Sequence, residues 1–260
     1  MPPVALSIAG SDPSGGAGIQ ADLKTFHQFG VYGEAVITLL TVQNTTELKH
    51  VEILPAGLVF QQIDALLRDI PPQAVKTGAL GSAEIVEAVA RALRGTDCPL
   101  VVDPVTISKH GAALLQESAV EALRSLLLPR AALFTPNIPE AAGFSGVGIE
   151  SLDDVRRAAG RLHEMGAQAV LIKGGHLTGD AIDLLSDGSG FREFRAPRIV
   201  TSHTHGVGCT YSAAIAAGLA LGRPLADAVA GAKRYIQEAI RTAPGLGCGS
   251  GPVNHHSEVV

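Results

Sequence analysis

Cysteine and concentrated positive charge are both scarce in this chain, and each shortage excludes a class of protein. Only three cysteines occur in 260 residues, and Cys98, Cys209 and Cys248 are too widely spaced for a disulfide framework or a paired CxxC metal site. Lys and Arg number 20 against 25 Asp and Glu, so the formal net charge is −5. Because no block of basic residues could neutralise a phosphodiester backbone, we expect no nucleic-acid partner.

Export signals and long apolar runs are lacking as well. The N-terminal MPPVALSIAG carries two prolines and a short apolar run in place of the basic flank and long apolar region of a signal peptide, which predicts a cytoplasmic location. The longest weakly polar stretch, residues 211–222, is too short to cross a bilayer, so no membrane span is expected. The sequence has no GxxxxGK[ST], which excludes a P-loop.

Strand-length apolar runs alternate with helical patterns along most of the chain. Ile19, Leu23 and Phe26 recur at helical spacing before Gly30. Ser151, with Asp154 three residues later, predicts the N-cap of a further helix. The strand-length runs are VALSIAG, EAVITLLTV, AVKTGAL, PLVVDPV, AALFTPN and AVLIKGG. Such alternation is typical of a parallel sheet with helices on both faces.

The pattern changes near residue 181, where two short strand-like runs, AIDLLSD and GFREFRA, flank a turn at 187–190. This arrangement predicts a β hairpin, and helices are expected again at 207–222 and about 224–241. No fixed-period repeat or linker divides the chain. We therefore predict one α/β domain over residues 1–260, with a mainly parallel central sheet, helices on both faces and a small peripheral hairpin.

The strongest local signal for chemistry is Cys209 in HTHGVGCTYSAA. A glycine-rich turn that opens a helix points unpaired backbone N–H groups at one spot, with the positive end of the helix dipole behind them, and so favours an anion. Gly206 and Gly208 would allow close approach of a phosphate. The same field is expected to lower the thiol pKa of Cys209 from about 8.5. The alternative is a small buried cysteine at a helix start.

The segment SIAGSDPSGGAGIQAD follows a strand and opens a helix. Gly16, Gly18 and Ala21 satisfy a GxGxxA dinucleotide fingerprint, which leaves a nicotinamide-dependent dehydrogenase as one alternative. A dinucleotide site also needs an acidic residue at the end of the second strand, and that strand ends in Gln43 and Asn44. A substrate-binding loop is therefore the better interpretation, although a plain tight turn would use the same glycines.

Oxygen and amine side chains follow three of the predicted strands. Asn137 and Glu140 lie three residues apart on one face of a short helix, where hard oxygen donors suit Mg²⁺, and the alternative is that the pair only caps the helix. Asp103 and Lys173 each end a strand, at the edge where open α/β sheets bind ligands. Asp103 is expected to orient Mg²⁺ and Lys173 to hold phosphate oxygens, unless both are ordinary exposed charges.

Histidine at His203, His205, His255 and His256 raises the possibility of a metal site, but no HExxH or Cys/His spacing supports zinc. His203 and His205 alternate on an extended segment. The terminal pair is expected to lie in a tail.

A series of motifs, in order across nearly the whole chain, resembles the hydroxymethylpyrimidine/phosphomethylpyrimidine kinases of thiamine biosynthesis, which belong to the ribokinase-like kinases. The motifs are SIAGSDPSGGAGIQAD, TVQNT, KTGAL, DPV, TPNIPEA, IKGGH, HTHGVGCTYSAA and GPVNH. The resemblance implies two phosphorylations by ATP, first of 4-amino-5-hydroxymethyl-2-methylpyrimidine and then of its monophosphate. It also implies a requirement for Mg²⁺ and a homodimer formed partly through peripheral strands.

The resemblance also implies roles for individual residues. Gln43 is similar to the residue that hydrogen-bonds the aminopyrimidine edge, and Asn137 and Glu140 are similar to an NxxE element for Mg²⁺ and phosphate. Lys173 is similar to a phosphate ligand. The pyrimidine pocket is expected to be lined by Gly10, Asp12, Ala17 and Ala79, and the anion hole to be formed by Gly206, Val207, Gly208 and Cys209. Relatives commonly have KTGML and GTGCT, so Ala79 and Val207 depart from the family pattern.

A mechanism follows for the cysteine, which replaces the aspartate base of related sugar kinases. Phosphoryl transfer passes through a loose transition state, so positioning and charge neutralisation matter more than a strong base. We hypothesise that Cys209 accepts both an alcohol and an anionic phosphate monoester because it can be neutral. Two alternatives stay open: a pyridoxal or pyridoxine kinase, and a non-catalytic pyrimidine sensor that has kept the pocket.

Overall fold

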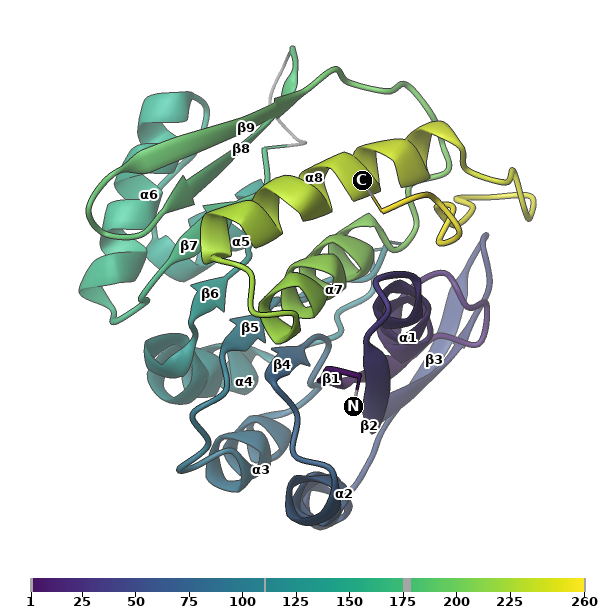
Figure 1. The fold of residues 1–260 in the computed structure, drawn as a ribbon, viewed down its shortest axis with the longest axis vertical. Helices are drawn as coiled ribbons and strands as arrows, with labels where there is room; N and C mark the ends of the chain where they lie inside the picture. Colours follow the sequence, from purple (N-terminus) through teal and green to yellow (C-terminus); the bar gives the residue numbers. More distant parts are fainter. Residues whose placement is uncertain (1, 110, 175–178, 260) are drawn as a thin grey trace.

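Nine strands of the described chain form one sheet, in the order β3-β2-β1-β4-β5-β6-β7-β8-β9 (Figure 1). The computed structural model describes residues 2–109, 111–174 and 179–259. Neighbours from β2 to β7 pair in parallel, whereas β3 and the hairpin β8–β9 pair antiparallel at the two edges. The strands are β1 Val4–Ser11, β2 Tyr32–Gln43, β3 Leu48–Ile53, β4 Ala74–Thr77, β5 Leu100–Val102, β6 Leu133–Phe134, β7 Val170–Ile172, β8 Ala181–Ser186 and β9 Phe191–Ala196.

Helices cover both faces of this sheet, as the alternating sequence pattern predicted (Figure 1). On one face lie α1 Gly18–Gln28, α7 Val207–Ala220 and α8 Leu225–Arg241. On the other face lie α2 Ala56–Asp69, α3 Ala83–Ala92, α4 Glu117–Ala122, α5 Ile138–Ser145 and α6 Leu152–Glu164, with a π-helical turn at Leu123–Leu127 and a 3-10 turn at Leu128–Arg130. The predicted mainly parallel α/β fold is therefore confirmed.

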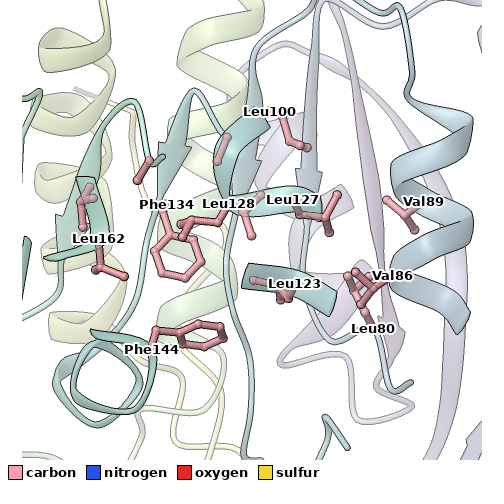
Figure 2. Packing of buried hydrophobic residues seen from close by; sticks show 14 of the residues in the cluster. Leu80, Val86, Val89, Leu100, Leu123, Leu127, Leu128, Phe134, Phe144 and Leu162 are labelled. Carbon is pink, nitrogen blue, oxygen red and sulfur yellow. The ribbon is translucent and has the colours of Figure 1, made fainter. Parts of the chain in front are cut away.

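The central strands are apolar throughout because they bury side chains on both faces. On β1, Leu6 and Ile8 pack towards the layer that contains α2 and α3, while Ala5 packs towards α1 and α7. On the α2–α6 face, Phe134 of β6 meets Phe144 of α5 edge to face, with ring centroids 5.3 Å apart (Figure 2). This contact anchors the segment between β6 and α5, where Asn137 lies.

Helix α7 is buried on nearly every side, between the sheet and α8. Small side chains make this possible, because its central residues are mostly Ala, Ser and Gly and let the neighbouring backbones approach closely. A Cβ atom on Gly218 would lie 2.9 Å from Cβ and 3.2 Å from Cα of Ala228 in α8. In the described residues, no helix is both long and apolar enough to span a bilayer.

Sequence patterns located the hairpin, the caps and most of the parallel strands. The hairpin β8–β9 turns between Ser186 and Phe191. Ser151 caps α6 in a capping box with Asp154. The patterns missed β3 and α2.

The expected C-terminal tail is wrong, because the segment at 245–257 packs against the rest of the protein. Val253 and His255 are buried, and Tyr235 Oη donates a hydrogen bond to the carbonyl oxygen of His255 at 2.9 Å. Further up, Ser250 N donates to the Thr45 carbonyl oxygen at 2.8 Å. A Cβ on Gly249 would lie 2.1 Å from that same oxygen, so only glycine allows this approach to the end of the β2–β3 hairpin.

The packing of α7 against α8 predicts opposite effects for two Gly→Ala substitutions. Gly218→Ala should destabilise the protein by about 1–3 kcal/mol, because the added methyl group forces the two helices apart. Gly231→Ala in α8 should stabilise it by about 0.5–1 kcal/mol, since the methyl group makes only ordinary contacts there and raises helix propensity. Urea unfolding measures both values. Equal effects at the two sites would contradict the close approach.

Candidate active site

Six parallel strands end at one edge of the sheet and deliver polar residues to a single cavity of about 670 Å³. Ser11 and Gln43 are the last residues of β1 and β2, and Asp103 and Lys173 follow β5 and β7 directly. Every residue that the sequence proposed for the site lines this cavity: Gly10, Asp12, Ala17, Gln43, Ala79, Asp103, Asn137, Glu140, Lys173, Gly206, Val207, Gly208 and Cys209. The carboxyl edge of the sheet is thus where these residues meet.

The loop after β1 is organised by the buried carboxylate of Asp12. Its Oδ1 accepts hydrogen bonds from Ser14 N and Oγ, and its Oδ2 accepts from the amides of Gly16 and Ala17 at 3.1 and 2.8 Å. His205 Nε2 lies 2.8 Å from the same Oδ2. Burial alone would raise the pKa of Asp12, but hydrogen bonds from His205 and Ser14 hold it well below its usual range. Asp12 lines the cavity, but both of its carboxylate oxygens already accept hydrogen bonds from groups of the protein itself.

The glycine turn before α7 brings a helix N-terminus to the cavity wall. Gly206 is the N-cap with φ +80°, and a Cβ there would lie 1.8 Å from the carbonyl oxygen of Gly16. The first intrahelical hydrogen bond runs from Thr210 N to Gly206 O. The amides of Gly208 and Cys209 precede it and therefore project from the helix end. Gly206 thus serves the packing of two loops, while Gly208 and Cys209 contribute backbone amides to the cavity wall, where the predicted anion site stays a prediction.

The thiol pKa of Cys209 is the one electrostatic expectation that the structure overturns. We expected the helix N-terminus to lower it, but burial raises the pKa of Cys209 to about 11, even though Lys76 acts in the opposite direction. The reason is that loss of hydration penalises the thiolate more than the helix end and the nearby lysine stabilise it. The Cys209 side chain is therefore a neutral thiol near pH 7.

An ion pair stands beside the helix end. Lys173 Nζ lies 2.8 Å from Asp103 Oδ1, and Ser212 Oγ donates to Asp103 Oδ2 at 3.1 Å. A Cβ on Gly208 would lie 3.4 Å from Lys173 Nζ, so the lysine is adjacent to the first turn of α7. Burial opposes both charges, but Lys173 lowers the pKa of Asp103 and Asp103 raises that of Lys173. Neither residue is the exposed end-of-strand charge of the alternative interpretation.

Asn137 and Glu140 form a capping box at the start of α5, so the helix-cap interpretation describes their contacts. Asn137 Oδ1 accepts from Glu140 N at 2.9 Å, and Glu140 Oε2 accepts from Asn137 N at 2.8 Å. Glu140 is nevertheless buried at the cavity, and burial raises its pKa to about 7, although Lys173 acts to lower it. The cap fixes both side chains in the wall of the cavity.

Sequence reasoning missed a second buried lysine behind the site. Lys76 of β4 is fully buried and bonds both oxygens of Asp22 in α1, at 3.0 and 2.8 Å. Burial alone would lower the pKa of Lys76, but Asp22 raises it. The KT pair in KTGAL was the only signal, because a lysine inside an apolar strand needs a buried partner.

Three other features of the sequence remain: the GxGxxA glycines, the IKGGH motif and the histidines. Gly18 has φ +58° and a Cβ there would lie 2.2 Å from the Gly10 carbonyl oxygen, which fits a tight turn better than a dinucleotide loop. Gly175 and His176 of the IKGGH motif lie outside the described residues. Among the described residues, no three His, Cys, Asp or Glu side chains gather into a metal site.

The chain is similar in sequence to known kinases over nearly its whole length. A family model described as phosphomethylpyrimidine kinase matches residues 12–254. A hydroxymethylpyrimidine/phosphomethylpyrimidine kinase of Streptomyces coelicolor is 51% identical over 98% of this chain and 94% of its own length.

Two solved structures of kinases are also similar to this chain. The chain is similar to phosphomethylpyrimidine kinase from Clostridium difficile, with 45% identity and a TM-score of 0.82 over 92% of this chain and 99% of that one. It is also similar to Bacillus subtilis pyridoxal kinase, solved as an ADP complex, with 36% identity and a TM-score of 0.91 over 99% and 98%.

The raised thiol pKa predicts how Cys209 reacts with iodoacetamide. In a variant that lacks the other two thiols, Cys98→Ser with Cys248→Ser, the alkylation rate should rise about tenfold per pH unit from pH 7 to 9.5 without levelling off. The reason is that the thiolate fraction keeps growing until the pH approaches about 11. Mass spectrometry follows the reaction. A plateau near pH 8 would show instead that the helix end dominates.

Proposed function

The chain belongs to the phosphomethylpyrimidine kinase family, and from that premise we propose that its cavity uses ATP to phosphorylate 4-amino-5-hydroxymethyl-2-methylpyrimidine and then the monophosphate so formed. The enzyme is a phosphotransferase of thiamine biosynthesis, as its relatives are. The observation that carries the assignment of roles is that the start of α7, with Lys173 beside it, lines the same cavity as Gln43.

The pyrimidine end of the cavity lies between the first two strands and the loop after β4. Gly10, Ala17 and Ala79 leave space for a flat ring, and Leu39 contributes an apolar wall. Gln43 offers an amide that can pair with both a ring nitrogen and an exocyclic amine. In the family pattern a larger residue commonly stands at position 79, so Ala79 gives the ring more room.

At the phosphate end, the amides of Gly208 and Cys209 and the ammonium group of Lys173 receive the migrating phosphoryl group. In a loose transition state the negative charge is spread over the equatorial oxygens, and fixed donors aimed at them stabilise it. Val207 supplies its backbone there but, unlike the threonine common in relatives, no hydroxyl group. Asn137, held by its capping box, faces the same region.

ATP as the phosphoryl donor is supported by the ADP complex of the Bacillus subtilis relative. Ile236 and Ile240 of α8 and Ile199 line the cavity beyond Val207 and offer an apolar wall to the adenine ring. The three free cysteines suit a reducing compartment, and we keep the cytoplasm as the proposed location.

The donor set at this end fits Mg²⁺. Asp103 and Glu140 provide two buried carboxyl groups close enough that Asp103 raises the pKa of Glu140. Few protein ligands are expected, since Mg²⁺ in kinases is held by one or two carboxylates together with substrate phosphates and waters. Asp103 and Glu140 would hold the ion, which neutralises phosphate charge when bound. Lys173 meanwhile keeps Asp103 ionised and in place.

A neutral Cys209 explains how one site can accept two different nucleophiles. Because bond formation lags in a loose transition state, the alcohol can keep its proton until the new P–O bond forms and then release it to an oxygen of the transferred phosphoryl group, so no base is needed at position 209. The monophosphate attacks through an oxygen that is already ionised near pH 7. A carboxylate at position 209 would repel that anion by about 4 kcal/mol at ~4 Å and an effective dielectric of 20. The thiol, with its pKa raised to about 11, carries no charge.

We also propose a homodimer. Leu40 and Val42 expose 43% and 54% of their surface on β2, next to the antiparallel edge strand β3. Exposed apolar side chains at a sheet edge lose contact with water when a second copy of the chain packs against them. Light scattering should give about twice the 26.7 kDa of one chain, and Val42→Glu should shift the protein towards the monomer. A monomeric wild type would refute the dimer.

A pyridoxal kinase is the second candidate, favoured by the TM-score of 0.91 to the Bacillus subtilis enzyme. Both functions can be compared in one assay. With ATP and Mg²⁺, the enzyme should convert the pyrimidine alcohol to species that are heavier by one and then two phosphoryl groups, and it should use pyridoxal less efficiently. If the enzyme phosphorylates only pyridoxal efficiently, it is a pyridoxal kinase. If no phosphorylated pyrimidine or pyridoxal forms, the kinase proposal is wrong and the pyrimidine sensor remains.

Substitution of Cys209 in the same assay tests the mechanism. Cys209→Asp should slow the second phosphorylation at least tenfold more than the first, because the new carboxylate repels the incoming monoester. Cys209→Ser, which stays neutral, should affect both steps alike and serves as the control. If Cys209→Asp leaves phosphorylation of the monophosphate undiminished, charge avoidance is not the reason for the cysteine.

A further inference from the structure

We propose that His205 and Asp12 form a positioning pair that fixes the orientation of the Gln43 side-chain amide, and so sets the preference of the cavity for a ring that carries an amine beside a ring nitrogen. The inference rests on the proposed function and deepens it. The three residues come from distant parts of the chain: the loop after β1, the end of β2, and the segment before α7.

The pair is buried and held from both sides. Asp12 and His205 are each more than nine-tenths buried, and Nε2 of the histidine lies 2.8 Å from Oδ2 of the aspartate. Because an ionised carboxylate only accepts hydrogen bonds, this nitrogen carries the proton. The backbone of His205 donates to the Gly251 carbonyl oxygen at 3.0 Å. Neither partner can turn away without breaking several other contacts.

Gln43 meets this pair through its amide nitrogen. Gln43 Nε2 lies 3.4 Å from His205 Nε2, and since that histidine nitrogen already donates to Asp12, the contact is a close approach of two donors to one carboxylate and not a hydrogen bond between them. The amide is also close enough to Asp12 that hydrogen bonding from Gln43 contributes to the low pKa of that carboxyl group. An acceptor-only carboxylate selects the amide orientation in which the NH₂ group, not the oxygen, faces it. One N–H is then used by Asp12, and Oε1 with the other N–H is left for the cavity.

This orientation decides which ring edge can pair with the amide. The edge left for the substrate has one acceptor and one donor, which complement an exocyclic amine and the ring nitrogen next to it. A flipped amide would present the same two groups in reversed order and would place its oxygen against the Asp12 carboxylate. Pyridoxal has no amine beside its ring nitrogen, so it gains less from a fixed amide. His205 therefore acts on specificity through Asp12 and Gln43 without touching the reacting atoms.

Two substitutions of His205 separate its hydrogen bond from its bulk. In His205→Gln the side-chain amide nitrogen can reach the place of Nε2 and donate to Asp12, whereas in His205→Asn the shorter side chain cannot. We expect His205→Asn to raise the KM for the pyrimidine alcohol about tenfold, the size of effect of one lost hydrogen bond to a charged group. The KM for ATP should change less than about twofold. His205→Gln should stay close to wild type.

The ratio of kcat/KM for the pyrimidine alcohol to that for pyridoxal is the decisive readout. It should fall in His205→Asn and be restored in His205→Gln. His255→Asn is the matched control, since His255 is also buried but bonds Thr210 at 3.1 Å, outside the cavity. Loss of this buried hydrogen bond should lower the stability of the control, but its ratio should equal that of wild type.

Each outcome bears on the inference separately from the proposed function. Wild-type activity on the pyrimidine alcohol tests the function, whereas the change in the ratio between variants tests the pair. Equal losses with both rings, or equal effects of Asn and Gln, would overturn the inference. Should His205→Asn fail to fold, Asp12→Asn removes the acceptor-only group at similar shape. It should lower the same ratio, and an unchanged ratio there would also overturn the inference.

Discussion

The site depends on the burial of a helix whose first amides face a cavity. Helix α7 can lie between the sheet and α8 only because its side chains are small, and it is buried over most of its length from Thr210 onward, while Val207, Gly208 and Cys209 at its start line the cavity. Backbone donors act more strongly on an anion in such a place than at an exposed helix end. The same burial suppresses ionisation of Cys209. One constraint thus produces both the backbone donors of the proposed phosphate site and an uncharged side chain beside them.

Most buried ionisable side chains at and behind the cavity have a partner from another element, and Glu140, whose carboxylate bonds the cap of its own helix, is an exception. Asp22 with Lys76, Asp103 with Lys173, and Asp12 with His205 each join residues from different elements. Burial of an ion pair gains little stability, because desolvation offsets most of the attraction, but loss of one partner is costly. Such pairs therefore serve to hold several strand ends in one arrangement.

The sequence was sufficient for the class of fold and for most of the cavity wall. Strand-length runs placed Asp103, Lys173 and Gln43 at strand ends, and parallel strands bring such ends together whatever lies between them. Contacts between distant segments had no such signal. Asp12 and His205 are separated by 193 residues, and nothing in either local pattern pointed to the other. The pKa of Cys209 was predicted in the wrong direction because the helix end is visible in the sequence and the depth of burial is not.

The packing of the glycine-rich segment near residue 249 against Thr45 has a consequence for how the protein matures. A ribosome delivers the chain from its N-terminus, so this segment emerges after every strand that lines the cavity. Until then the end of the β2–β3 hairpin, with Gln43 beside it, lacks one of its supports. A nascent chain can therefore complete its sheet before it acquires a rigid ring-binding wall, and competence for catalysis comes last.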